Sequence, residues 1–191
     1  MPSDILKAAR DGNLKMMKGI IYRGWIYPRM VLSRFYEKSN PNIRQNIAEF
    51  VGLYGFNIHA VGGSGGTPLL LACENATDSS SKCVALLLRF GADISDTSWY
   101  GGDSSLHRAC YWGNFKCVEL LLRFGADVNT TNDSMETPLH VASYEGRPKC
   151  MDILLKNGAN INAIDSDGDT PFDLACTEEE DIVLSRYLQG S

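Results

Sequence analysis

One six-residue pattern returns four times in this 191-residue chain. The four copies are Thr67–Ala72, Ser104–Ala109, Thr137–Ala142 and Thr170–Ala175. The last three begin at intervals of 33 residues. A Leu-Leu pair and then a Gly-Ala turn follow each of the first three copies. Self-similarity of this kind indicates stacked units, because one short unit cannot bury its apolar face without neighbours.

The letters of one copy predict its local structure. Thr137 is suited to cap a first helix, and Pro138 fits the first helical position because its missing N–H needs no partner there. Gly146 supplies the positive φ of a tight turn. A second helix is predicted from about Pro148 to Asn157, and the polar residues 160–168 predict a projecting turn.

Matched in residue type, spacing and order, these copies resemble the ankyrin repeat, with its period of 33 residues and its Thr-Pro-Leu-His-x-Ala signature. The resemblance implies an all-α solenoid of stacked helix-turn-helix units with projecting β-turn or hairpin loops. It covers residues 1–191 as a single domain. The expected units are an N-terminal capping repeat at 1–24, a divergent repeat at 25–60, repeats at 61–97, 98–131 and 132–164, and a C-terminal capping repeat at 165–191.

Several segments depart from the regular unit. Residues 25–60 are interpreted as a divergent repeat, with a helical insertion as the alternative. The glycine-rich residues 61–66 predict a hinge or a loop that orders on binding. Three extra residues in the 61–97 repeat are expected in a polar loop at 75–82, between two helices. In the last unit we expect Glu178–Glu180 to be exposed, as suits an end cap.

The formal net charge is −5 and is unevenly spread. Residues 1–60 contain 9 Lys and Arg against 4 Asp and Glu, whereas residues 61–191 contain 9 against 19. The acidic body favours a partner with basic groups. A solvated surface with chance asymmetry is the alternative. Nucleic acid is disfavoured because it needs a basic stripe, although the basic first 60 residues leave that reading open.

Six cysteines occupy two equivalent positions of the repeat. They are Cys73, Cys110 and Cys176 in the first helices, and Cys83, Cys117 and Cys150 in the second helices. Both positions are predicted on helix faces inside the stack, where free cysteine packs as a small hydrophobe. With no Cys-x-x-Cys pair, we expect neither disulfides nor a metal site. Reduced thiols fit an intracellular location, cytoplasmic or nuclear.

Residues of catalytic type follow the repeat rather than a separate grouping. His107 and His140 are the fourth letter of the signature, and the resemblance implies that they bond backbone groups of neighbouring turns. No Ser/His/Asp set stands apart from the register, and residues 62–66 lack the lysine of a P-loop. We therefore expect no enzymatic activity and no cofactor. No apolar run is long enough to cross a membrane, and no secretory signal opens the sequence.

Asn129 and Asn162 occupy an asparagine position that, by the resemblance, is hydroxylated in some ankyrin proteins. The alternative, which we favour, is an asparagine that stabilises the turn.

The resemblance also implies where a partner would bind, at the projecting turn tips and the inner face of the first helices. Mapped by register, the expected contacts combine aromatic anchors, which dominate interface hot spots, with carboxylates, which steer basic segments. The aromatic residues are Trp99, Tyr100, Tyr111, Trp112 and Tyr144. The acidic residues are Asp103, Asp133, Glu136, Glu145, Asp167 and Asp169. Packing between repeats is the alternative role for Tyr111 and Trp112.

These observations favour a non-enzymatic protein–protein interaction module, an adaptor or scaffold that is monomeric by itself. It would bind a basic protein or peptide on a concave aromatic and acidic face. A second hypothesis is an adaptor or inhibitor that binds an acidic protein surface or nucleic acid through residues 25–66. A third is a regulatory subunit of an enzyme. Binding that falls steeply with salt and survives loss of the aromatic residues would favour the second.

Overall fold

The computed structural model describes residues 7, 10–13, 15, 61, 66–74, 76, 78–98 and 100–188. The capping repeat predicted at 1–24 and the divergent repeat predicted at 25–60 lie almost wholly outside these residues, and so do Trp99 and most of the glycine-rich segment. The described helices are α5 (Pro68–Cys73), α6 (Asp78–Arg89), α7 (Ser105–Tyr111), α8 (Phe115–Arg123), α9 (Pro138–Tyr144), α10 (Pro148–Lys156) and α11 (Glu178–Leu188).

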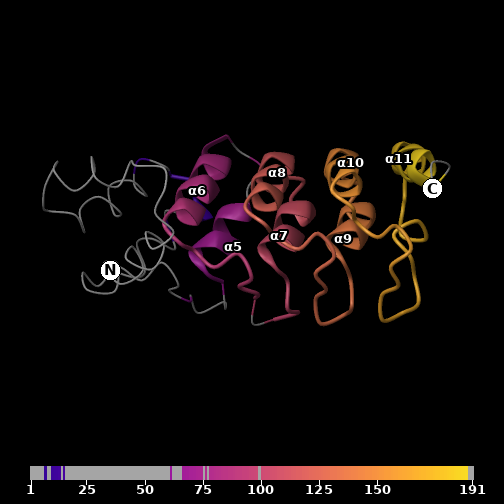
Figure 1. The fold of residues 1–191 in the computed structure, drawn as a ribbon, viewed down its shortest axis with the longest axis horizontal. Coiled ribbons are helices and arrows are strands. Elements are labelled where there is room, and N and C mark those ends of the chain that lie inside the picture. Colours follow the sequence, from indigo (N-terminus) through magenta and orange to yellow (C-terminus); the bar gives the residue numbers. More distant parts are fainter. Residues whose placement is uncertain are drawn as a thin grey trace, which may run out of the picture.

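The helices stack as two rows (Figure 1). The first helices α5, α7 and α9 form one row, and the second helices α6, α8 and α10 form the other, which α11 continues. Loops project from the stack on the side of the first helices. The described residues contain no strand, only an isolated antiparallel bridge between Thr97 and Ser104. The predicted all-α architecture with projecting loops is therefore confirmed.

Hydroxyl caps start the first helices. The side chains of Thr67, Ser104 and Thr137 each accept a hydrogen bond from the backbone N–H three residues later. Such a cap satisfies one of the amide groups that a helix start leaves without a partner, and contributes about 1 kcal/mol. Pro68 and Pro138 follow at the first helical position, as the sequence predicts.

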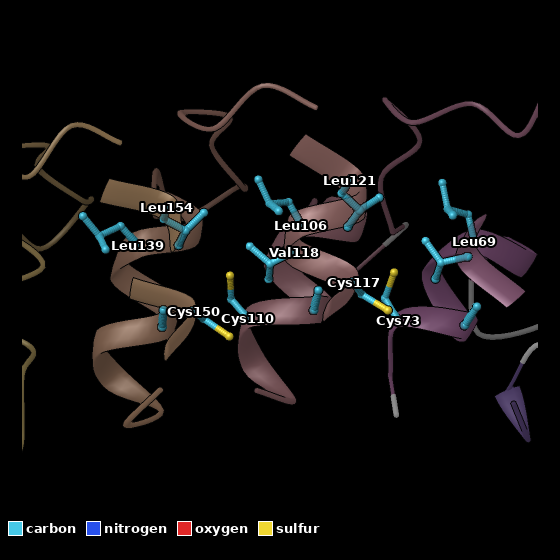
Figure 2. Packing of buried hydrophobic residues seen from close by; sticks show 14 of the residues in the cluster. Leu69, Cys73, Leu106, Cys110, Cys117, Val118, Leu121, Leu139, Cys150 and Leu154 are labelled. Carbon is cyan, nitrogen blue, oxygen red and sulfur yellow. The ribbon is translucent and has the colours of Figure 1, made fainter. Parts of the chain in front are cut away.

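Leucines from both rows fill the space between repeats (Figure 2). Leu106 and Leu139 come from first helices, Leu121 and Leu154 from second helices, and all four are fully buried. Each such leucine contributes roughly 2 kcal/mol of hydrophobic free energy. The fold is held together by this continuous core, which no single unit could form alone.

Two pairs of thiols face each other across repeat boundaries, Cys73 with Cys117 and Cys110 with Cys150 (Figure 2). Contact with Cys117, together with burial, raises the pKa of the Cys73 thiol, and burial raises the pKa of the Cys110 thiol. The Cys73 and Cys110 thiols are therefore protonated, which leaves them poor nucleophiles. Cys83 is buried as well, which confirms the packing role of these five cysteines.

The last unit differs from its prediction. Residues 171–174 form turns rather than a first helix, so Cys176 is exposed instead of buried. The second helix, which the sequence places near Asp181–Leu188, is α11 and begins at Glu178. Phe172 is exposed, although the residues in register with it, Leu106 and Leu139, are buried.

The prediction that Glu180 is exposed is wrong. Its side chain is 1% exposed, and Oε2 accepts hydrogen bonds from the backbone N–H groups of Cys176 (2.7 Å) and Thr177 (3.0 Å). The carboxylate thus caps α11 from within. It also lies against Gly146, where a Cβ would approach Oε1 to 2.9 Å. Gly146 therefore needs to be glycine for two reasons, its φ of 65° and this contact.

The insertion predicted as a loop at 75–82 instead lengthens a helix. Helix α6 has 12 residues, whereas α8 and α10 have 9 each. In register with α8, helix α6 would begin at residue 81. The extra residues 78–80 form an additional first turn.

Ser105 occupies the position that proline holds in the other units, and its buried hydroxyl has no hydrogen-bond partner in the described structure. We expect Ser105→Pro to stabilise the fold by about 1 kcal/mol, because proline stiffens the unfolded chain and removes the unpaired hydroxyl. Ser104 already has the extended conformation that must precede proline (φ −76°, ψ 167°). Urea denaturation measures the change, and Ser105→Ala separates the hydroxyl contribution from the stiffening. A Ser105→Pro chain less stable than Ser105→Ala would contradict the expected fit.

Candidate functional site

Two histidines fasten the projecting loops to the helices. His107 Nδ1 accepts from the backbone N–H of Ser104 (3.1 Å), so the ring proton lies on Nε2, which donates to the Glu136 carbonyl at 2.9 Å. His140 repeats the arrangement, accepting from Thr137 N–H (3.0 Å) and donating to the Asp169 carbonyl (3.2 Å). Each imidazole therefore joins the cap of one first helix to the loop of the next repeat.

We call these histidine bonds between a helix cap and the next loop the histidine latch. The latch requires a neutral imidazole ring. Burial lowers the pKa of His107 below its usual value, although the bond to the Glu136 carbonyl opposes the change. A second proton would enter at Nδ1, where the Ser104 N–H already points. The site thus places His107 in the neutral Nε2–H form at neutral pH.

The loop after α8 folds around one asparagine. Asn132 Oδ1 accepts from the backbone N–H groups of Ser134 and Glu136, both at 3.0 Å. Its Nδ2 donates to Glu136 Oε2 (2.7 Å) and, across the repeat boundary, to Asp103 Oδ1 (3.1 Å). Asn132 therefore holds two of the predicted acidic residues, Asp103 and Glu136, beside each other.

The loop tips are linked in a row. Asp133 N–H donates to the Gly101 carbonyl (3.0 Å), and Ser166 N–H donates to the Ser134 carbonyl (2.9 Å). Asp165, in register with Asn132, accepts from Asp167 and Asp169 N–H through Oδ1. The three loops at 92–104, 126–137 and 159–170, called the projecting loops below, are thus tied to one another as well as to the helices.

Asn129 makes a turn-stabilising contact between repeats. Its Nδ2 donates to the Gly158 carbonyl (3.2 Å), and its Oδ1 accepts from Asn160 N–H (2.8 Å). Asn162, the other asparagine considered for hydroxylation, is exposed. The geometry at Asn129 agrees with the structural role that we favoured there.

Four of the five predicted aromatic anchors are described, and all are exposed. Tyr111 and Trp112, at the end of α7, are 47% and 46% exposed and contact each other edge to face with ring centroids 5.5 Å apart. Tyr144 takes the equivalent place on α9 at 65%, and Tyr100 on a loop tip reaches 75%. Large aromatic surface of this kind needs an explanation outside the core.

The six predicted carboxylates are not equivalent. Asp133 and Asp167 are exposed at the loop tips. Asp103 forms an ion pair with Arg108 (3.4 Å), which also lies 4.0 Å from Glu74, and Glu145 lies 4.0 Å from Arg147. Glu136 and Asp169 are partly buried, and their carbonyls accept the histidine bonds. Charge on the first helices is therefore largely balanced locally.

Negative charge is concentrated in the projecting loops. Their sequences contain nine acidic residues and no Lys or Arg. The second helices show the opposite pattern, with an exposed cation at the same two register positions of each. These residues are Lys82, Arg89, Lys116, Arg123, Lys149 and Lys156. The difference in net charge between residues 1–60 and 61–191 does not reveal this separation of loop carboxylates from helix cations. The positions of the charges within each repeat do reveal it.

No group of three or more potential metal ligands occurs among the described residues. None of the described helices is both long and apolar enough to cross a membrane.

Comparison with known families agrees with the architecture. A family model described as ankyrin repeats, in three copies, matches residues 5–132 and again 106–185. The chain belongs to the ankyrin-repeat family. Ankyrin repeats are generic protein-interaction modules and are typically non-enzymatic. The family therefore supports the predicted role of this chain in protein–protein interaction. A search of curated proteins found no match.

The histidine latch makes stability depend on pH. The pKa of His107 is lower in the folded chain than in the unfolded chain, so the unfolded state binds more protons and stability falls as pH drops below about 6.5. We expect His107→Gln to cost about 1–2 kcal/mol at pH 7, because the partly buried Glu136 carbonyl loses its donor. Glutamine still suits the capping box and does not titrate.

The deficit of His107→Gln relative to wild type should therefore shrink between pH 7 and pH 5.5, as measured by urea denaturation at each pH. Parallel pH curves for the two proteins would show that His107 does not carry the dependence.

Proposed function

We propose that this ankyrin stack binds a protein or peptide bearing Lys or Arg side chains, on the surface formed by the projecting loops and the exposed ends of the first helices. We call this surface the loop face. The observation that carries the proposal is the combination of exposed Tyr100, Tyr111, Trp112 and Tyr144 with loops that contain nine carboxylates and no cation.

The aromatic residues supply affinity. Tyr and Trp bury a large area while ordering only two side-chain torsions each, which is why they dominate interface hot spots. Tyr111 and Trp112 already support one another by their edge-to-face contact, so less freedom is lost when a partner covers them. Tyr144 extends the same row by one repeat. These three rings would form the apolar centre of a larger interface.

The carboxylates supply attraction and register. Asp133 and Asp167 project at neighbouring tips and are available to a cation from outside, whereas Asp103 is already paired with Arg108. Exposed charges mainly accelerate association and exclude acidic competitors, and salt screens them over about 8–10 Å. A basic partner is therefore expected to associate faster at low ionic strength.

The aromatic contribution is tested with the variant Tyr111→Ala/Trp112→Ala/Tyr144→Ala. We expect partners captured from a cell lysate by the wild-type chain to be reduced at least tenfold, since each hot-spot truncation costs about 1 kcal/mol or more. The matched control is Phe124→Ala/Ile182→Ala, which removes exposed apolar residues away from the loop face.

Circular dichroism and thermal unfolding must show all three chains folded. Partners that remain on the triple variant would sink the loop-face proposal, and would direct attention to residues 25–66.

The acidic contribution is tested with Asp133→Asn/Asp167→Asn. We expect a several-fold lower association rate with a captured partner at low salt, and a weaker salt dependence than wild type, because two unpaired charges leave the tips. Surface plasmon resonance at two or three salt concentrations measures both. Glu119→Gln on α8 serves as the control, since it removes one exposed carboxylate from a second helix. Equal rates for all three chains would rule out electrostatic attraction by the tips.

A further inference from the structure

Met135 has an unfavourable backbone conformation for its residue type. Its φ is 59°, and it alone among the described non-glycine residues has a positive φ. The equivalent positions of the neighbouring loops are glycines, Gly102 with φ 66° and Gly168 with φ 91°. A side chain in this region costs of order 1 kcal/mol, so glycine would suit the loop better.

The side chain of Met135 does not offset this cost by packing inside the chain, because it is 56% exposed. A side chain that is more than half exposed gains little from burial to set against the strain. Strain of this kind persists where the surrounding structure over-determines it, and it clusters at sites that contact ligands.

Met135 lies within an apolar and acidic neighbourhood at the loop tips. Tyr100, the most exposed large apolar side chain described, is on the preceding tip, which the Asp133–Gly101 backbone bond joins to the tip of Met135. The Asp133 carboxylate also lies against Gly102. Asp133 precedes Met135 by two residues and Glu136 follows it directly. Two exposed apolar side chains are thus flanked by carboxylates.

We propose that Tyr100 and Met135 form a second apolar contact for the partner of the loop face, and that this contact receives an aliphatic or aromatic side chain flanked by Lys or Arg in an extended peptide segment. The inference rests on the proposed function and adds the chemistry of the ligand. An apolar side chain meets Tyr100 and the flexible thioether of Met135, which adapts to varied shapes. The flanking cations meet Asp133 and Glu136, and an acidic segment would be repelled.

The probes are peptides selected on the wild-type chain from a phage-displayed library of random 16-residue peptides, then synthesised and measured by fluorescence polarisation. We expect the enriched sequences to carry an apolar residue with Lys or Arg within two or three positions. Enrichment of acidic peptides, or of none, overturns the inference. The latter outcome leaves the proposed function standing, since that function also allows a folded partner.

Met135→Gly gives the decisive comparison. We expect it to bind the selected peptides about tenfold more weakly, because one apolar contact is lost, and yet to unfold a few degrees higher, because the strain is relieved. Met135→Leu keeps both the apolar side chain and the strained conformation, and should bind within about twofold of wild type. Met135→Asn tolerates the left-handed conformation without an apolar side chain, and should bind as weakly as Met135→Gly.

The outcomes separate the two proposals. Peptides that bind Met135→Gly as well as wild type, but lose affinity for the Tyr111/Trp112/Tyr144 triple alanine variant, overturn this inference alone. Peptides that bind the triple variant undiminished count against the loop-face aromatic site itself. A Met135→Asn chain that is no more stable than wild type removes the strain on which the inference stands, because asparagine tolerates the left-handed conformation without the extra freedom that glycine gives the unfolded chain.

Discussion

The loop face depends on one hydrogen bond repeated along the stack, from a histidine Nε2–H to the backbone carbonyl of the next loop. It runs from His107 to Glu136 and from His140 to Asp169. A neutral imidazole can accept at one nitrogen and donate at the other, so one side chain completes a helix cap and fastens a loop together. The loops are rich in like charge, and each packs against the core near its start, as Ala126 and Val128 do. The latch and the tip-to-tip bonds position the parts of the loops that project beyond these residues.

Much of this arrangement can be read from the sequence because the repeat makes local signals reinforce one another. A lone threonine before a proline predicts a cap weakly, but the same pair at Thr67, Thr137 and Thr170, with glycine turns in phase, predicts a stack. Repeat register also predicts that Tyr111 and Tyr144 occupy equivalent positions, and both are exposed. In these units the periodicity therefore predicts exposed positions as well as buried ones.

Register predicts least where a unit lacks a neighbour or changes a contact. Glu180 looked exposed as part of an acidic run, yet it is in phase with Arg147, and both side chains cover the turn glycine of the preceding repeat. Cys176 follows the cysteine pattern but lies after a first segment that stays in turns. Met135 did leave a sequence signal, because a non-glycine residue stands where its neighbours have glycine. The sequence does not show whether the loop adapts to this residue. The positive φ of Met135 shows that the loop has the same left-handed conformation here as its glycine-containing neighbours.

Charge in the loops divides into two groups with different consequences. Asp127 and Asp165 accept backbone N–H bonds inside their own turns, so these carboxylates stabilise the conformation of the loops. Asp133 and Asp167 are exposed at adjacent tips that a backbone bond holds together, so both carboxylates contribute to the negative potential of the tips. A cation placed there would be attracted by both. The bonds that position the loops therefore also determine where this negative potential lies.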